Sequence, residues 1–162
     1  MYEALAKGGP IIGAAWASGS MLGHLRSVSL MDIVSAVPEG ALVVNLQYGD
    51  RTSEIEAAQR ARPDITILDD PEVDQMADLA TFFAQVAAMD RILTIDNTTA
   101  HVAGAIGHDD THVLIPTGSE CMWYWGNEGD IDPWYGNLKL YRQAKLGQWD
   151  QPLSMMKTAV CP

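Results

Sequence analysis

The residues best suited to binding chemistry are 96–101, which separate an apolar run from a segment of small residues. The apolar run, 92–95, predicts a buried strand that ends at Asp96. The residues that follow predict a short helix with Thr98 or Thr99 as its N-cap. The first turn of such a helix offers free backbone N–H groups beside hydroxyls, an arrangement that binds phosphate, and His101 adds a donor nearby. An ordinary, well-capped strand–helix connection explains the same residues, so both interpretations stay open.

The rest of the chain alternates apolar runs with helical patterns. A capping pair, Ser29 and Asp32, indicates a helix start, and the tail up to Pro162 shows little periodicity. The loop after the first strand is small and flexible but is not a GxGxxG motif. We expect strands at 11–16, 41–47, 65–68, 92–95, 112–115 and 138–141, with further helices at 52–62 and 73–89. The second of these helices is predicted to be amphipathic, with the apolar face Val73, Met76, Ala80, Phe83 and Ala87.

Apolar strands that alternate with helices predict an α/β fold, a Rossmann-like parallel sheet with helices on both faces. We expect the strand order 3-2-1-4-5 plus a short edge strand, in a single domain over residues 1–162. In such a sheet the ligand crevice lies at the carboxyl ends of the first and fourth strands. That rule predicts that three segments meet at this crevice: 17–26, 47–54 and 96–101.

The composition excludes several other classes of protein. The chain has 162 residues, and its net charge of −11 comes from 21 acidic against 10 basic residues, which argues against a nucleic-acid partner. We expect no membrane span and no signal peptide, because the sequence has no apolar run of that length and no basic-then-apolar start. Cys121 and Cys161 lack ligand-spaced partners, so we expect no metal site, no disulfide framework and a cytoplasmic location.

Several motifs, in order, are similar to those of a known family: WASG…RSVSL, VVNLQYGD, AAMDRILTIDNTTAHVAGAIG, DPWYGNLKLYRQ and GQWD. Over roughly residues 11–150 the chain resembles the C-terminal, donor-binding half of GT-B glycosyltransferases. The similarity is greatest to the domains that follow tetratricopeptide repeats in bacterial proteins and to the heptosyltransferases. The resemblance implies a donor that is a UDP-, GDP- or ADP-sugar, with no other cofactor.

The resemblance also assigns roles to individual residues. The diphosphate would lie against the helix start, with Asp96 beside the sugar or ribose hydroxyls and Arg26 facing a phosphate. Gln47 and Glu54 would meet the nucleoside. The positions carried over for donor binding are Arg26, Gln47, Glu54, Asp96, Asn97, Thr98, Thr99, Ala100 and His101.

A GT-B enzyme reacts in the cleft between two domains, and the resemblance covers only the donor-binding one. Transfer therefore requires an N-terminal acceptor domain, and no catalytic residue is assigned. The alternatives are a non-catalytic nucleotide-binding or protein-interaction module and half of a nucleotide-sugar epimerase. We expect Trp123, Trp125 and Trp134 to form core or a domain interface rather than a sugar platform. Exposed aromatic surface there would suit docking to an N-terminal domain or self-association. His24, His108 and His112 are expected on the surface.

Overall fold

The computed structural model describes residues 1–161, and those residues contain one six-stranded parallel sheet of order β3-β2-β1-β4-β5-β6. The predicted order is confirmed, and β6 is the expected edge strand. It pairs with β5 in parallel, with Leu114 opposite Tyr141. The strands are β1 (Ile11–Ala15), β2 (Leu42–Asn45), β3 (Thr66–Leu68), β4 (Arg91–Ile95), β5 (Thr111–Ile115) and β6 (Leu138–Arg142).

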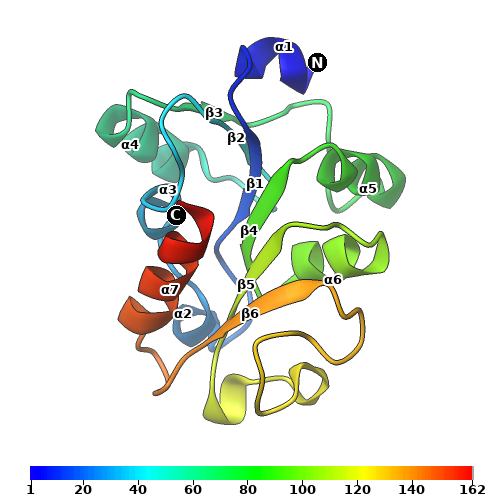
Figure 1. Ribbon diagram of the computed structural model, residues 1–162. Coiled ribbons are helices and arrows are strands. Elements are labelled where there is room, and N and C mark those ends of the chain that lie inside the picture. The colour runs from blue at the N-terminus through cyan, green and yellow to red at the C-terminus, as the bar shows by residue number, and fades with distance from the viewer. Residues whose placement is uncertain (162) are drawn as a thin grey trace.

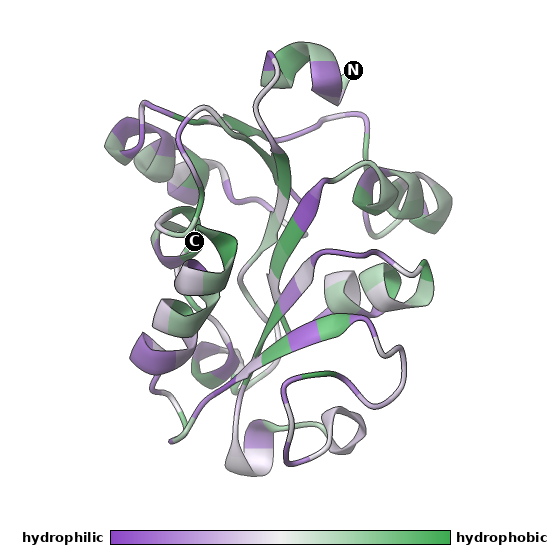
Figure 2. Ribbon diagram, in the orientation of Figure 1, coloured by the Kyte–Doolittle hydropathy of each residue, from purple (hydrophilic) through white to green (hydrophobic). Residues whose placement is uncertain are grey.

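Helices cover both faces of this sheet, as expected (Figure 1). One face carries α3 (Leu30–Val34), α4 (Thr52–Ala61) and α7 (Asp150–Val160). The other carries α5 (Leu79–Ala87) and α6 (Thr98–Ala105). Apolar strand residues therefore pack on both sides, and Figure 2 shows hydrophobic colour on parts of the strands and on α5.

Shorter elements lie near the amino and carboxyl ends of the strands. Helix α1 (Tyr2–Ala6) precedes β1, and α2 (Gly23–Arg26) follows it. The segment between β5 and β6 contains two 3-10 turns, η1 (Gly118–Glu120) and η2 (Trp123–Trp125), and lies below the sheet in Figure 1. Between Met1 and Cys161, no helix has the length and apolar character needed to cross a bilayer.

The capping pair before α3 is confirmed. Ser29 Oγ accepts from the N–H of Asp32, and the Asp32 carboxylate accepts from the N–H of Ser29. This reciprocal pattern satisfies two amides that the helix itself cannot bond. The predicted helix at 52–62 is confirmed as α4.

The predicted helix at 73–89 is wrong in its start and in its buried face. Asp74 Oδ1 accepts from the N–H groups of Met76 and Ala77, which fixes a turn there. The helix begins only at Leu79, where the Asp78 side chain caps it. The buried residues of α5 are Phe82, Gln85 and Val86, not the predicted Phe83 and Ala87, which are exposed.

The aperiodic tail forms α7, which the sequence analysis did not predict. Its buried residues, Pro152, Met156 and Val160, are spaced by four, and Met156 and Val160 pack on the face shared with α3 and α4. Because Pro152 and Met156 are not the branched aliphatic residues that usually mark the buried face of a helix, hydrophobic spacing did not predict this helix.

Candidate functional site

The loops after β1 and β4 meet at the carboxyl edge of the sheet, and one buried ion pair joins them. Arg26, the last residue of α2, donates from its Nη2 to Asp96 Oδ2 at 2.7 Å and to the Asp96 carbonyl at 3.1 Å. The two side chains are 9% and 0% exposed. The expected convergence of segments 17–26 and 96–101 is therefore present.

Burial and pairing act in opposite directions on Asp96. Burial raises the pKa of its carboxyl to about 6, although the neighbouring Arg26 guanidinium lowers it. At neutral pH the carboxylate is ionised and the pair is neutral overall. The Arg26 guanidinium is thus already paired with the carboxylate and the carbonyl of Asp96, the residue that follows β4.

The start of α6 is capped one residue earlier than predicted. The N-cap is Asn97, whose Oδ1 accepts from the N–H of Thr99 at 3.0 Å and from the hydroxyl of Thr94 at 3.1 Å. Asn97 takes the role because its backbone is extended there, whereas Thr98 and Thr99 are already helical. Thr98 is exposed at this end of the helix.

The two threonines of α6 have different environments. Thr99 is buried, and its hydroxyl donates to the Leu46 carbonyl at 3.4 Å, which ties α6 to the end of β2. Ala100 is buried beneath the helix start as well. Of the residues carried over for the phosphate, Thr98 is thus the one whose side chain is open to solvent, with His101 half-buried beside it.

Gln47 and Glu54 reach the same edge from β2 and α4, and both contact Trp16. Gln47 Oε1 accepts from the N–H groups of Trp16 and Ala17 at 3.0 and 2.8 Å. Glu54 Oε2 accepts from the Trp16 indole N–H at 2.6 Å, and Oε1 accepts from Arg51 at 2.9 Å. Gln47 is buried, so its side chain acts as a brace between β1 and β2.

His101 faces a cluster of aromatic rings that the segment between β5 and β6 supplies. Its ring stacks on Trp125, with centroids 5.0 Å apart, and its Nδ1 is hydrogen-bonded to the Tyr135 hydroxyl at 3.1 Å. Burial lowers the pKa of His101, so the ring is neutral at pH 7. A hollow of ≈ 390 Å³ lies over it, lined also by Trp123, Tyr124 and Trp134.

Of the three tryptophans expected in the core or at a domain interface, one lies in the core and two are exposed. Trp125 is 1% exposed, but Trp123 and Trp134 are 76% and 64% exposed. The prediction that His112 lies on the surface is wrong. His112 is buried between Asp110, which faces its Nε2 at 2.9 Å, and the Tyr141 hydroxyl, which faces its Nδ1 at 2.8 Å.

Asp132 and Arg142 fix the backbone of the segment between β5 and β6, which we call the aromatic segment, and neither residue was predicted from the sequence. The buried Asp132 carboxylate accepts from the N–H groups of Trp134, Tyr135, Gly136 and Leu138. An Asp before a glycine-containing turn was the available signal. Arg142 donates to the carbonyls of Trp125, Gly126, Glu128 and Gly129.

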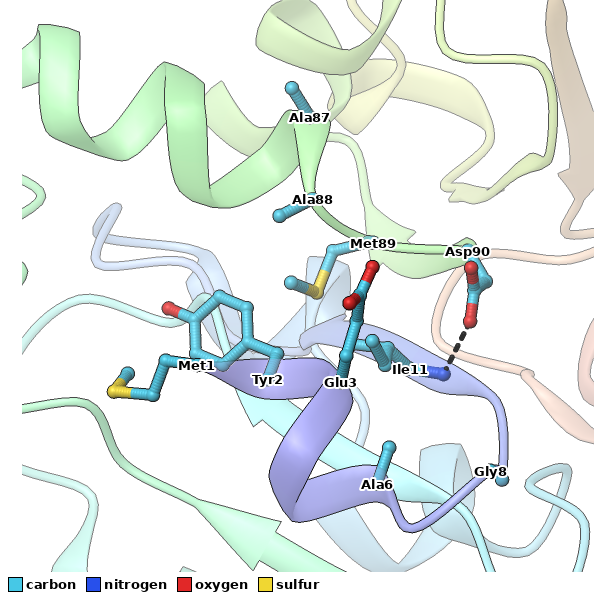
Figure 3. Close-up of a pocket in the computed structure, with 11 residues that line it drawn as sticks. Met1, Tyr2, Glu3, Ala6, Gly8, Ile11, Ala87, Ala88, Met89 and Asp90 are labelled. Atoms are coloured by element: carbon cyan, nitrogen blue, oxygen red, sulfur yellow. Dashed lines mark hydrogen bonds between the residues drawn. The ribbon is translucent and has the colours of Figure 1, made fainter.

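Other hollows adjoin or oppose the site. Asn97, Thr98 and Thr99 line a narrow one of ≈ 30 Å³, and Gln47 borders another of ≈ 290 Å³ that Asp69 and Asp74 also line. A hollow of ≈ 640 Å³ lies at the amino ends of β1 and β4, between α1 and the end of α5. Figure 3 shows its lining, where the Asp90 carboxylate accepts from the N–H of Ile11.

Taken together, the fold and this edge define an α/β protein of the Rossmann-like class, with its polar residues gathered where the strand order reverses. No family model matches the sequence. The chain is similar to the protein FlbA of Caulobacter vibrioides, with 30% identity over 156 residues. The match covers 94% of this chain but 25% of FlbA, so the chain spans about a quarter of the length of that relative.

Proposed function

We propose that this chain is the nucleotide-sugar-binding domain of a GT-B type glycosyltransferase, with a UDP-, GDP- or ADP-sugar as its donor. The observation that carries the proposal is the Arg26–Asp96 pair, which brings the loops after β1 and β4 together beside the start of α6. Ligands of open α/β sheets bind at this reversal of strand order.

The start of α6 is suited to a diphosphate. The helix dipole places partial positive charge there, and the exposed Thr98 hydroxyl lies in the first turn. Because Arg26 neutralises Asp96, the nearby carboxylate cancels little of that positive potential. Glycosyl transfer needs a stabilised leaving diphosphate, and oriented helix amides supply such stabilisation without reorganising.

The nucleoside is proposed to lie on the β2 side of the diphosphate. Glu54 is partly exposed there, and its carboxylate can accept hydrogen bonds from ribose hydroxyls. Gln47 supports this side indirectly, since it fixes the backbone of Trp16 and Ala17.

Complete transfer is proposed to need a second, acceptor-binding domain. The hollows that border the predicted residues are open and separate, as one wall of a cleft between domains would be. The similarity to a fourfold longer relative supports a place for this domain within a larger assembly.

Isothermal titration calorimetry with UDP, GDP and ADP tests the proposal. At least one nucleotide should bind, and Thr98→Ala should weaken that binding about 10- to 100-fold, because it removes a hydrogen bond to the charged diphosphate. Thr158→Ala, which removes an exposed hydroxyl on α7, is the matched control and should leave affinity unchanged. If every nucleotide is silent at millimolar concentration, the proposal is wrong.

A second candidate is a non-catalytic nucleotide-binding or protein-interaction module with the same fold. The observation that favours it is that Arg26 and His101 already have partners inside the domain. Silent nucleotides would favour this interpretation in its protein-interaction form.

A further inference from the structure

Two tryptophans of the segment between β5 and β6 present their rings to solvent. Trp123 is 76% exposed and Trp134 is 64% exposed. Their ring centroids are 5.9 Å apart and their planes are inclined by 83°, so the indoles form a right-angled corner. We call these two rings, with the His101, Tyr124, Trp125 and Tyr135 rings that line the same hollow, the aromatic corner.

The aromatic corner is held firmly in place. Asp132 accepts four backbone N–H groups on one side of the segment, and Arg142 donates to four carbonyls on the other. Tyr135 packs so closely on α6 that a Cβ at Gly104 would overlap its ring. Large exposed aromatic rings on a fixed backbone are typical of a binding surface, because they lose little side-chain entropy when a ligand arrives.

We propose that the aromatic corner binds the pyranose ring of a carbohydrate. The axial C–H groups of a pyranose form an apolar face that packs against the electron-rich face of an indole. The ring hydroxyls then need polar neighbours, and Tyr135 and His101, which are hydrogen-bonded to each other, line the same hollow. The segment also carries Glu120, Glu128 and Asp130, which favours a neutral ring over an anion.

The identity of that sugar rests on the proposed function. The proposed nucleoside residues lie on the β2 side of α6, and the strand order places β5 on the other side of β4. A diphosphate at the start of α6 would therefore direct its sugar toward β5 and the aromatic corner. His101 connects the two sites, because it belongs to the first turn of α6 and also lines the hollow.

The first test uses free methyl hexopyranosides and ligand-observed saturation-transfer NMR on the 162-residue chain. Saturation should reach the ring C–H protons of at least one glycoside. Trp123→Ala and Trp134→Ala should each reduce that transfer about two- to tenfold, the loss expected for one aromatic contact. Met155→Ala, which removes a half-exposed apolar side chain on α7, is the control and should change nothing.

The second test separates the sugar from the nucleotide. Calorimetry compares UDP-glucose, GDP-mannose and ADP-glucose with UDP, GDP and ADP. The sugar should tighten binding, and either tryptophan variant should remove that increment while the bare nucleotide keeps its affinity. Circular dichroism and thermal unfolding report whether each variant folds, which the high exposure of both indoles favours.

The outcomes distinguish the two proposals. Tryptophan-dependent glycoside binding with silent nucleotides supports the aromatic corner and overturns the proposed function. The opposite result is nucleotide binding without a glycoside signal and without a tryptophan-dependent gain in affinity from the sugar. It supports the proposed function and overturns the aromatic corner as a carbohydrate site. If light scattering instead shows a mass that rises with concentration and falls in Trp123→Ala, the aromatic corner is a contact between copies of the chain, and the carbohydrate proposal is wrong.

Discussion

The Arg26 guanidinium and the Asp96 carboxylate lie 2.7 Å apart, both buried, and join the segments that follow the first and fourth strands of the sheet. Removing one member of such a pair leaves an uncompensated buried charge, which costs more than the pair itself contributes. The stability of the domain therefore depends on both residues together.

Arg26→Met should lower the free energy of unfolding by about 3 to 5 kcal/mol at pH 7.5. Burial raises the pKa of Asp96 to about 6 in the folded state, above its usual value, and loss of Arg26 raises it further. A raised folded pKa means that stability is present at low pH and is lost as pH rises through that pKa. The cost should thus shrink at pH 5, which urea unfolding at both pH values measures.

The double variant Arg26→Met with Asp96→Asn is the control for the pair. It removes both charges and should recover most of the stability lost in the single variant. An equal loss at pH 5 and pH 7.5 would contradict a charge-based origin.

Asn97→Ala should cost about 0.5 to 2 kcal/mol, because the Asn97 side chain caps α6. Thr98→Ala is the matched comparison, since Thr98 is exposed and already helical, and it should cost less. Thermal unfolding measures both. A larger loss in Thr98→Ala would mean that the cap is assigned to the wrong residue.

Gly104→Ala should destabilise the domain by about 1 to 3 kcal/mol through overpacking against Tyr135. In a Tyr135→Ala background the same change should be harmless or stabilising, because alanine favours a helix over glycine by about 1 kcal/mol. A double-mutant cycle from chemical unfolding measures the coupling. An identical cost in both backgrounds would show that the aromatic segment does not pack on α6 as described.

Asp110→Asn should lower stability at neutral pH by about 1 to 3 kcal/mol and flatten its loss in acid. Although burial raises it, hydrogen bonds from Lys139, Arg91 and His112 bring the pKa of Asp110 well below its usual range. A depressed carboxyl pKa contributes stability that disappears as pH falls below the unfolded value, near 3.8. Unfolding curves between pH 2 and pH 7 test this, with the exposed Asp109→Asn as the control.

The sheet was predictable from sequence because its strands are nearly continuous apolar runs, and the pattern left few alternatives to a parallel sheet. Helix α5 was misjudged because Phe83 and Ala87 fit a helical period although Phe82 and Val86 face the core. Two overlapping apolar stripes on one helix cannot be ranked by spacing alone. The stripe that faces the core, with Phe82 and Val86, is identified only in the structure, where Asp78 caps the start of the helix.

The convergence of the segments was predictable from the sequence, but their side-chain contacts were not. The segments 17–26 and 96–101 meet as the fold class requires. No spacing rule, however, indicates that Arg26 turns inward to Asp96, that Gln47 braces Trp16, or that Asp132 organises the aromatic segment. Each of these contacts depends on where the folded backbone places the two residues, and the sequence pattern does not specify that.

Amide chemical shifts of the ¹⁵N-labelled chain, titrated with UDP, GDP and ADP, test the central claim most directly. The account predicts that one nucleotide shifts the resonances of Thr98, Thr99, Ala100 and His101, together with those of the loop after β1. Unshifted spectra at millimolar nucleotide, or shifts confined to the hollow between α1 and α5, would contradict it.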